Sequence, residues 1–377
     1  MNFADIGKLA KRRRLEVVLI RNPAIIRALT GVNCDNAILQ IKAAGTPLPQ
    51  ATFFTDFRYV PMVHRVAPKL ACRDIRKFAS LLTEKRCLSA LTEKRYLSAL
   101  TEKRCLSALV EKRRPRRFMR IGYESTISHA QFLAWQEKFP RAKFVDVAKD
   151  LAELRAVKTT DEIAGVCAAE RLTCEIWKAA SARFRAGMTE RDMARIIRKM
   201  MIERGDGEAF DTIVSIGKNA AECHHEPDDT VWNGREPVLV DMGVKLNGFC
   251  SDLTRNLVPR PFKLYSQVYA LVREANRAAI AAARPGMTGK ALDKVARDVI
   301  RKGGFGHCFG HSLGHGVGYE IHEAPFASKK SDMKLKPGML VTIEPGIYLE
   351  DNLGVRIEDL VLITETGCEV LSASAAI

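Results

Sequence analysis

Short apolar runs bounded by polar residues predict alternating strands and helices at the start of the chain. Strand-like runs lie at 15–20, 51–55, 118–123 and 143–147, and the segments between them have helical or loop patterns. Apolar runs of this length between turn residues are typical of buried strands. The pattern therefore predicts an α/β domain over residues 1–147.

The remainder, residues 148–377, is predicted to be a second domain of mixed α and β structure. A helical pattern covers 148–204, with a helix start at Thr189, where a hydroxyl residue precedes an acidic first turn. Beyond residue 210, strands and glycine-rich turns dominate, and a helical stretch at about 265–302 interrupts them. The change in pattern predicts a domain boundary at 147–148.

Two carboxylates flank the most distinct turn of this second domain. Asn247-Gly248 separates two strand-like runs, and Asn-Gly is a strong signal for a two-residue hairpin turn. With these residues as the turn, Asp241 pairs with Thr254, and Asp241 and Asp252 share one face about 7–8 Å apart. Two solvated aspartates on an exposed hairpin would have the same spacing, so this hairpin alone does not indicate a function.

A second carboxylate pair surrounds another predicted turn. Glu344 and Glu358 lie symmetrically about Asp351, so a hairpin centred there places both on one face. Glu344 stands among apolar residues and before a proline, where an unpaired charge is costly and a cation is expected nearby. Arg356 is a candidate for that cation, or for a clamp that holds a ligand carboxylate.

The histidines are concentrated in the same region, with six of the eight after residue 220. His311 and His315 have an HxxxH spacing, but four glycines within 310–318 disfavour the helix of a zincin site. The stretch 310–314 also matches the GxSxG motif of serine hydrolases. Its preceding segment is a poor strand and no histidine follows His322, so we expect no nucleophile elbow.

Five side chains are candidate metal ligands. Four carboxylates and one imidazole suit hard or borderline divalent ions such as Mn²⁺, Co²⁺ or Zn²⁺. This number of carboxylates exceeds what one ion needs and allows two ions bridged by shared oxygens. The predicted ligands are Asp241, Asp252, His315, Glu344 and Glu358.

A net charge of +16 would ordinarily indicate an acidic partner such as nucleic acid. Half of this charge comes from residues 81–120, which hold twelve Lys or Arg against four Glu. Most of that segment is a nine-residue tandem repeat at 82–113, rich in helix formers but without a single apolar stripe. We interpret the repeat as a tolerated helix extension, with a basic docking element as the alternative, and do not expect nucleic acid as a partner.

Composition indicates a globular protein of a reducing compartment. With 47% apolar residues, the 377-residue chain is long enough for two domains with their own cores. Its ten cysteines show no CxxC spacing, which favours reduced thiols and a cytoplasmic location. No apolar run approaches the roughly 18 residues of a membrane helix, and the run at 15–20 is too short for a signal-peptide core.

Taken in chain order, the motifs of the second domain resemble those of the pita-bread metallopeptidases. They are NAAECHH at 219–225, DMG at 241–243, SDLTR at 251–255, HSLGHGVGYEIHE at 311–323, IEPG at 343–346 and VRIED at 355–359. The likeness is greatest to the Xaa-Pro peptidases, prolidase and aminopeptidase P. Less specific similarity to a creatinase-type N-terminal domain is found in RNP at 21–23, LTG at 29–31 and TDFRY at 55–59. The resemblance implies a creatinase-like α/β domain over 1–147 followed by an α+β pita-bread catalytic domain over 148–377.

The resemblance also implies two divalent metal ions, with Mn²⁺ expected first and Co²⁺ or Zn²⁺ as alternatives. In the family pattern Asp252 and Glu358 bridge the ions, and Glu344 is both a ligand and a general base. A hydroxide that bridges the ions attacks the scissile carbonyl. All five ligand positions are filled in this chain, which distinguishes it from relatives that have lost metal binding.

The remaining site residues are carried over by motif. His224 and His322 match the family's catalytic histidines, which hydrogen-bond the substrate carbonyl as negative charge develops. His311 lines the site and, with Arg356, is expected to bind the substrate. Glu222-Cys223 departs from the family pattern in the loop that presents His224.

The resulting expectation is a cytoplasmic, homodimeric hydrolase of peptides with proline at the second position. It would cleave the bond before that proline, as an Xaa-Pro aminopeptidase or an Xaa-Pro dipeptidase. The alternatives are an aminopeptidase of the same fold with another specificity and a basic relative that binds nucleic acid or protein. Substrate length, the native ion and the role of the repeat stay open at this point.

Overall fold

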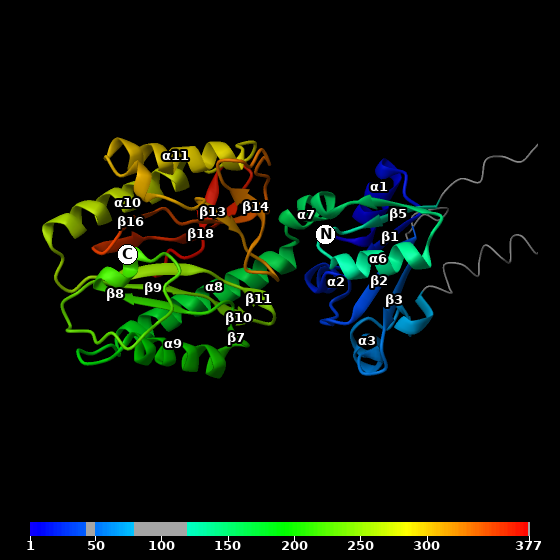
Figure 1. Ribbon diagram of the computed structural model, residues 1–377, viewed down its shortest axis with the longest axis horizontal. Coiled ribbons are helices and arrows are strands. Elements are labelled where there is room, and N and C mark those ends of the chain that lie inside the picture. The colour runs from blue at the N-terminus through cyan, green and yellow to red at the C-terminus, as the bar shows by residue number, and fades with distance from the viewer. Residues whose placement is uncertain (43–49, 79–118, 376–377) are drawn as a thin grey trace, which may run out of the picture. The chain divides into compact units, whose positions relative to one another are not determined.

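Two units make up the described part of the chain, which comprises residues 1–42, 50–78 and 119–375 of the computed structural model (Figure 1). The tandem repeat at 82–113 lies outside the described residues. The units are Met1–Leu154 and Arg155–Ile377. The first unit extends past residue 147, because Leu151 and Leu154 of helix α7 (Ala148–Ala156) pack into the N-terminal core.

A mixed six-stranded sheet forms the N-terminal unit, with the strand order β4-β3-β2-β1-β5-β6. Apolar side chains cover both of its faces. Val17 and Leu19 of β1 belong to one core cluster, whereas Val18 and Ile20 belong to the other, which explains why this strand is a continuous apolar run. The strands are β1 (Val17–Ile20), β2 (Ala37–Lys42), β3 (Gln50–Thr55), β4 (Ala71–Asp74), β5 (Met119–Tyr123) and β6 (Ala142–Asp146), and the helices before α7 are α1 (Phe3–Arg13), α2 (Pro23–Thr30), α3 (Val60–Val66) and α6 (His129–Lys138).

The four predicted strands of this unit are present as β1, β3, β5 and β6, and its α/β class is confirmed. Two further strands were not predicted. Strand β2 is buried along almost its whole length, and such a run cannot be told from a buried helix segment by periodicity. Strand β4 has four residues and none of them is buried, so it leaves no apolar signal.

In the C-terminal unit, helices α10 and α11 lie at the top of the view in Figure 1 and α9 lies at the bottom, with the strands between them. The strands form several small sheets, with the orders β11-β10-β7, β12-β9-β8, β13-β14, β15-β18-β19 and β16-β17. The helices are α8 (Thr160–Ser181), α9 (Glu190–Arg204), α10 (Lys263–Ala282) and α11 (Gly289–Lys302), and the strands are β7 (Gly207–Glu208), β8 (Ile213–Ile216), β9 (Val238–Met242), β10 (Val244–Leu246), β11 (Phe249–Cys250), β12 (Leu253–Leu257), β13 (Gly314–Gly316), β14 (Glu323–Ala327), β15 (Leu340–Ile343), β16 (Gly346–Leu349), β17 (Leu353–Arg356), β18 (Asp359–Ile363) and β19 (Cys368–Val370).

The helical regions predicted in this unit are present but divided. Helix α9 begins at Thr189 with a capping box, which confirms the predicted start. The stretch at 265–302 is two helices, α10 and α11, separated by a turn in which Gly286 has a φ of 83°. No helix among the described residues combines the length and the apolar character needed to cross a membrane.

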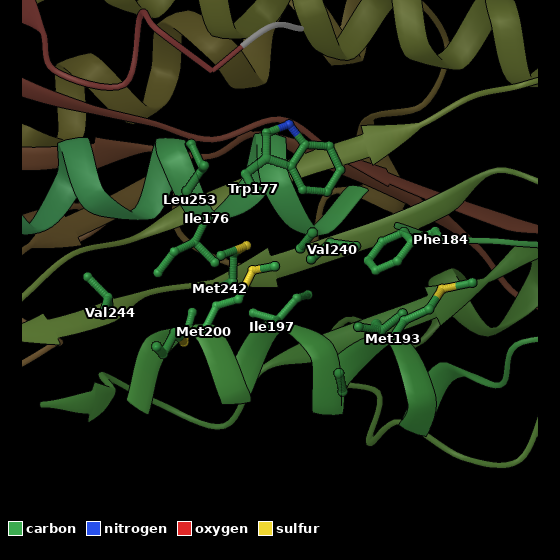
Figure 2. Packing of buried hydrophobic residues seen from close by; sticks show 14 of the residues in the cluster. Ile176, Trp177, Phe184, Met193, Ile197, Met200, Val240, Met242, Val244 and Leu253 are labelled. Carbon is green, nitrogen blue, oxygen red and sulfur yellow. The ribbon is translucent and has the colours of Figure 1, made fainter. Parts of the chain in front are cut away.

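An apolar core holds α8 and α9 against the sheet that carries Asp241 (Figure 2). Trp177 of α8 and Ile197 of α9 pack in one cluster with Val240 and Met242 of β9. Each of these side chains is almost completely buried, and burying such a side chain stabilises a fold by about 1.5–3 kcal/mol. The core therefore fixes strand β9 on both sides of Asp241.

The first predicted hairpin has the predicted register. Asp241 of β9 pairs with Thr254 of β12. Asn247 and Gly248 form the turn between β10 and β11, with φ angles of 50° and 78°. Positive φ at both turn residues is the requirement that makes Asn-Gly the preferred pair.

The second hairpin is centred on Asp351, as predicted. Strands β16 and β17 pair Leu349 with Leu353, and Asp351 has a φ of 55°. The same register continues in β15 and β18, where Ile343 pairs with Asp359. Glu344 and Glu358 therefore stand opposite each other, in the gap between the two ladders.

Candidate metal centre and active site

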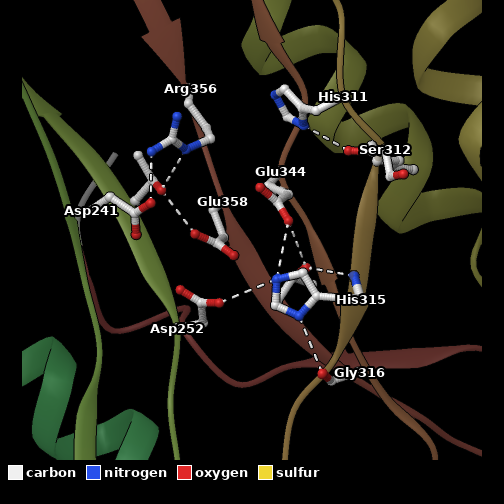
Figure 3. Close-up of polar contacts among 12 residues, drawn as sticks. Asp241, Asp252, His311, Ser312, His315, Gly316, Glu344, Arg356 and Glu358 are labelled. Carbon is white, nitrogen blue, oxygen red and sulfur yellow. Dashed lines mark hydrogen bonds and ion pairs between the residues drawn. The ribbon is translucent and has the colours of Figure 1, made fainter. Parts of the chain in front are cut away.

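The five predicted metal ligands converge on one small region, where Figure 3 shows their side chains directed toward one another. Each comes from a strand or from a residue next to a strand end. Asp241 lies on β9, Asp252 just before β12, His315 on β13, Glu344 just after β15 and Glu358 just before β18. The centre is therefore assembled by strand pairing between distant parts of the chain.

His315 lies in the middle of this group. Its Nε2 is 3.5 Å from Asp252 Oδ2 and 3.4 Å from Glu344 Oε1, and donor atoms of Asp252, His315 and Glu358 all lie within 4.8 Å of one another. The other ring nitrogen, Nδ1, donates to the Gly316 carbonyl at 3.2 Å. In the neutral ring the Nε2 lone pair therefore faces carboxylate oxygens, an arrangement that a cation between them would stabilise.

Thr342 holds two of the ligands in place. Its Oγ1 donates to Glu344 Oε1 at 3.2 Å and accepts from the His315 backbone N–H at 3.0 Å. This contact requires β13 to lie directly against β15. A Cβ atom at Gly314 would be 1.9 Å from the Thr342 carbonyl oxygen, so the glycine permits the close approach.

The charges of the site are unbalanced without a cation. Burial, with the neighbouring carboxylates adding to it, raises the pKa values of Asp252 and Glu358 well above their ordinary range, and burial raises that of Glu344 to about 8. Burial lowers the pKa of His315 to about 4, so its ring is neutral. Asp241 Oδ1 and Glu358 Oε1 are buried without a hydrogen-bond partner among the described residues. Neutral imidazole, orphaned oxygens and four clustered carboxylates together fit a pair of divalent ions.

Arg356 is buried beside Asp241 and not beside Glu344. Its Nη2 donates to Asp241 Oδ2 at 2.6 Å, its Nε to Thr254 Oγ1 at 3.0 Å and its Nη1 to the Tyr348 hydroxyl at 2.8 Å. The sequence offered this residue an ion pair with Glu344 or a clamp on a ligand carboxylate, and the contact with Asp241, a predicted metal ligand, agrees with the second. The pair forms with Asp241 instead, because the guanidinium reaches the point where Asp241 and Thr254 are paired across β9 and β12.

The predicted catalytic histidines lie in the same cavity as the ligands. The cavity has a volume of about 870 Å³. His224 and His322 are exposed within it, and the ring of His322 packs edge-on against that of His315, with 4.3 Å between the ring centres. The sequence-predicted site residues that line it are His224, Asp241, Asp252, His311, His315, His322, Glu344, Arg356 and Glu358.

His311 lines the cavity and is held there by a hydrogen bond with Tyr348. Its Nδ1 donates to the Ser312 carbonyl at 2.7 Å, so its Nε2 accepts from the Tyr348 hydroxyl at 3.0 Å. Burial, together with the nearby Arg356 guanidinium, lowers the pKa of His311 to about 4. Tyr348 thus connects a neutral histidine to the arginine that holds Asp241.

Ser312 is not a hydrolase nucleophile. A 3-10 turn at Gly306–Cys308 precedes it, and strand β13 follows it where an elbow needs a helix. The GxSxG match at 310–314 is therefore coincidental, as expected.

Four residues of the site were not predicted: Thr254, Thr342, Tyr348 and Glu170. The first three could have been found from the predicted hairpin registers. Thr254 is the partner of Asp241, and Thr342 and Tyr348 are separated from Glu344 by even numbers of positions, which places them on its face of the strand. Glu170 has no such signal, because it reaches the site from helix α8.

Glu170 is fully buried, and its Oε2 accepts a hydrogen bond from the Asp252 backbone N–H at 3.2 Å. Burial raises its pKa from 4.5 to about 8. The folded state therefore favours the protonated form of Glu170. The stability that this protonation contributes is complete below about pH 4.5 and is lost as the pH rises through about 8. We expect Glu170→Gln to be more stable than the unaltered protein, by under about 1 kcal/mol at pH 5 and by a few kcal/mol at pH 9.

Urea unfolding of both chelated proteins at the two pH values measures this difference. Glutamine keeps an oxygen that accepts from Asp252, so the comparison isolates the charge of Glu170. An advantage that is equal at both pH values would show that ionisation of Glu170 does not limit stability.

A second group of potential ligands, Glu190, His225 and Asp228, also has donor atoms within 4.8 Å of one another. Its atoms already have partners. Glu190 Oε2 accepts from His225 Nε2 at 2.7 Å and from the Asp228 backbone N–H at 3.0 Å. We therefore assign no ion to this group.

Comparison with known proteins identifies the family of this chain. The model of metallopeptidase family M24 matches residues 164–365, and that of the creatinase/prolidase N-terminal domain matches residues 4–157. The chain belongs to metallopeptidase family M24. This membership confirms the expected fold, a creatinase-type N-terminal domain followed by a pita-bread catalytic domain.

Relatives of this M24 metallopeptidase include proteins named Xaa-Pro dipeptidase and X-Pro aminopeptidase. It is 39% identical over 254 residues to the Xaa-Pro dipeptidase of Pyrococcus furiosus, which covers 67% of this chain and 73% of the relative. The solved Xaa-Pro dipeptidase from Bacillus anthracis matches with a TM-score of 0.84 and 27% identity, over 98% of this chain and 96% of the other. The X-Pro aminopeptidase from Thermotoga maritima matches with a TM-score of 0.79 and 30% identity, over 99% and 98%.

Proposed function

We propose that this metallopeptidase hydrolyses the bond between an N-terminal residue and a proline at the second position. The observation that carries the proposal is the complete donor set, which lies in one cavity with His224 and His322. The Xaa-Pro dipeptidases among its relatives support the same substrate class. An aminopeptidase of other specificity, and a basic relative that binds nucleic acid or protein, have no comparable support.

The proposed cofactors are two divalent metal ions, with Mn²⁺ expected first and Co²⁺ or Zn²⁺ as alternatives. Asp241, Asp252, His315, Glu344 and Glu358 would hold them, with Asp252 and Glu358 shared. When bound, such ions lower the pKa of water toward neutrality and polarise a carbonyl oxygen. The raised pKa values of Asp252 and Glu358 support this assignment, because burial and the neighbouring carboxylates disfavour their charged forms unless a cation lies between them.

Glu344 is the proposed general base. Thr342 fixes the orientation of the Glu344 carboxyl group beside the other predicted ligands, and a carboxylate is a common general base. It would take a proton from the attacking water and deliver it to the proline nitrogen as the peptide bond breaks. Transfer to that nitrogen is needed because the amine is otherwise a poor leaving group.

The histidines and Arg356 would orient the substrate. His224 and His322 are proposed to donate hydrogen bonds to the scissile carbonyl oxygen as it becomes negative. His311 and Arg356 are proposed to bind the rest of the peptide. The second N–H of Arg356 Nη1 donates to the Cys223 carbonyl at 3.2 Å, which leaves one Nη2 N–H as the donor for a substrate carboxylate.

We further propose a cytoplasmic homodimer. The cysteines of the described residues are all free, which supports a reducing compartment. The homodimer rests on the family resemblance alone.

An activity assay tests the proposed function. We expect the metal-reconstituted protein to release the N-terminal residue from Xaa-Pro dipeptides, from Xaa-Pro-Yaa tripeptides or from both, and to lose this activity on chelation. Peptides with alanine in place of proline are the matched control, and their turnover should be at least about tenfold slower. Cleavage of neither proline series would refute the proposal, and equal cleavage of the alanine series would favour an aminopeptidase of other specificity. Adding back Mn²⁺, Co²⁺ and Zn²⁺ separately identifies the preferred ion.

A further inference from the structure

The loop that carries His224 into the cavity is held by one buried carboxylate. This loop follows β8, begins with the 3-10 turn η2 (Gly217–Ala221) and returns toward β9. Glu190, the first residue of α9, is fully buried beneath it. Its two oxygens accept hydrogen bonds from Ile216 N at 2.6 Å, Asn219 Nδ2 at 2.9 Å, His225 Nε2 at 2.7 Å and Asp228 N at 3.0 Å.

His225 connects this buried carboxylate to a second one on the loop itself. Its Nε2 is 2.7 Å from Glu190 Oε2, and its Nδ1 is 3.0 Å from Glu222 Oε2. A carboxylate oxygen is an acceptor, and a neutral imidazole has only one N–H to donate. Both contacts are hydrogen bonds only when both ring nitrogens carry a proton, that is, when the ring is an imidazolium.

The surroundings favour this charged form. Burial works against charge on the ring, but hydrogen bonds to Glu222 and Glu190 and the negative charges of Glu190 and Asp228 leave the pKa of His225 above its ordinary value. The adjacent cation of α9, Arg191, forms its ion pair with Asp229. The balance of the groups that face His225 is therefore negative.

We propose that His225 is a positioning residue whose imidazolium, held between Glu190 and Glu222, fixes the loop that presents His224 to the cavity. His224 is exposed in the cavity, whereas the next residue, His225, is buried against α9. Fixing the backbone at His225 therefore fixes the origin of the His224 side chain. The catalytic readout of this proposal rests on the proposed function, while the clamp formed by Glu190, His225 and Glu222 is a property of the fold.

The clamp has a consequence for the pH dependence of turnover. When His225 loses its proton, one of its two contacts becomes lone pair against lone pair, and the loop is no longer held on both sides. We expect kcat to fall as the pH rises through the pKa of His225, with no loss of metal. KM should change little, because the substrate contacts outside this loop are unaffected.

Histidine-selective ¹³C NMR of the full-length protein, reconstituted with diamagnetic Zn²⁺, measures the protonation of His225 directly. His225→Gln assigns the resonance. We expect a titration midpoint above the ordinary histidine value of about 6.5. Glu222→Gln should lower that midpoint by about one pH unit, because it removes one of the two carboxylates. The pH at which kcat falls on the alkaline side of its pH profile should decrease by the same amount.

Glu203→Gln is the matched control. Like Glu222, Glu203 is an exposed glutamate of the catalytic unit, with 58% of its side chain exposed against 69% for Glu222. It pairs with Lys199 on α9 at 3.8 Å and has no contact with the clamp. This variant should change neither the midpoint of His225 nor the pH profile.

Two outcomes of these experiments would contradict the clamp. A midpoint near 6.5 in the unaltered protein would show that the ring is not held as an imidazolium. A midpoint that moves in Glu222→Gln without a matching shift of kcat would show that His225 does not position His224. His225→Gln should lower kcat about tenfold at neutral pH with unchanged metal content, and if it fails to fold, Glu222→Gln still gives the answer.

Failure of the proposed function is recognised separately. A protein that hydrolyses no Xaa-Pro peptide would refute the proposed substrate. The NMR titration of His225 and its response to Glu222→Gln would still show whether the clamp exists.

Discussion

Replacing Asp252 by alanine should abolish both metal binding and turnover. Asp252 is buried, its Oδ2 lies 3.5 Å from His315 Nε2, and it would hold both of the proposed ions. Loss of the ions would remove several kcal/mol of transition-state stabilisation. We therefore expect kcat to fall at least about 1,000-fold, since each 1.4 kcal/mol is about tenfold in rate. Metal analysis of the dialysed protein and the rate of proline release measure the two effects.

Asp252→Asn separates loss of the ligand from loss of the fold, because it keeps the shape of the side chain. In the chelated state it should unfold no more easily than the unaltered protein, because the raised pKa of Asp252 shows that its charge is disfavoured there. Thermal unfolding checks this. Two ions per chain together with normal turnover in Asp252→Ala would contradict the ligand assignment.

Replacing His322 by alanine should have a different result, in which the metals stay and turnover is lost. His322 is exposed in the cavity, and it contacts His315 by ring packing, so it is not part of the donor group. Removing one donor to a developing oxyanion typically lowers kcat by about 100-fold to 1,000-fold. We expect about 100-fold here, with the metal content unchanged.

The matched control is His307→Ala, which removes an exposed histidine of the same unit that does not line the cavity. It should retain normal turnover. Unchanged turnover in His322→Ala would remove His322 from the mechanism, and a loss of metal would show instead that its ring supports His315 as a ligand.

The parts of the site that sequence could predict depend on strand periodicity. Side chains alternate across a strand, so a turn centre places every residue of a hairpin on one face or the other. The turn at Asn247 predicted the pairing of Asp241 with Thr254, and the centre at Asp351 predicted that Glu344 and Glu358 share a face. Both geometries are confirmed.

The parts that sequence could not predict depend on contacts between distant segments. Glu170 meets Asp252 across 82 positions of the chain, and no local pattern encodes that distance. The sequence left Arg356 as either the partner of Glu344 or a clamp for a ligand carboxylate, and the packing of its hairpin against β9 places it on the carboxylate of Asp241. In the N-terminal unit, β2 was not predicted because it is buried along almost its whole length and shows no alternation. Strand β4 was not predicted because none of its residues is buried.

The register centred on Asp351 limits how this part of the gene can change length. Strands β16 and β17 and strands β15 and β18 share that one centre, so the turn sets the phase of Glu344 relative to Glu358. An insertion or deletion of one residue in the turn would rotate Glu358 to the opposite face, whereas a change of two residues would restore its orientation. The insertion or deletion of one codon is therefore far more damaging here than a substitution. The turn can vary in composition more readily than in length.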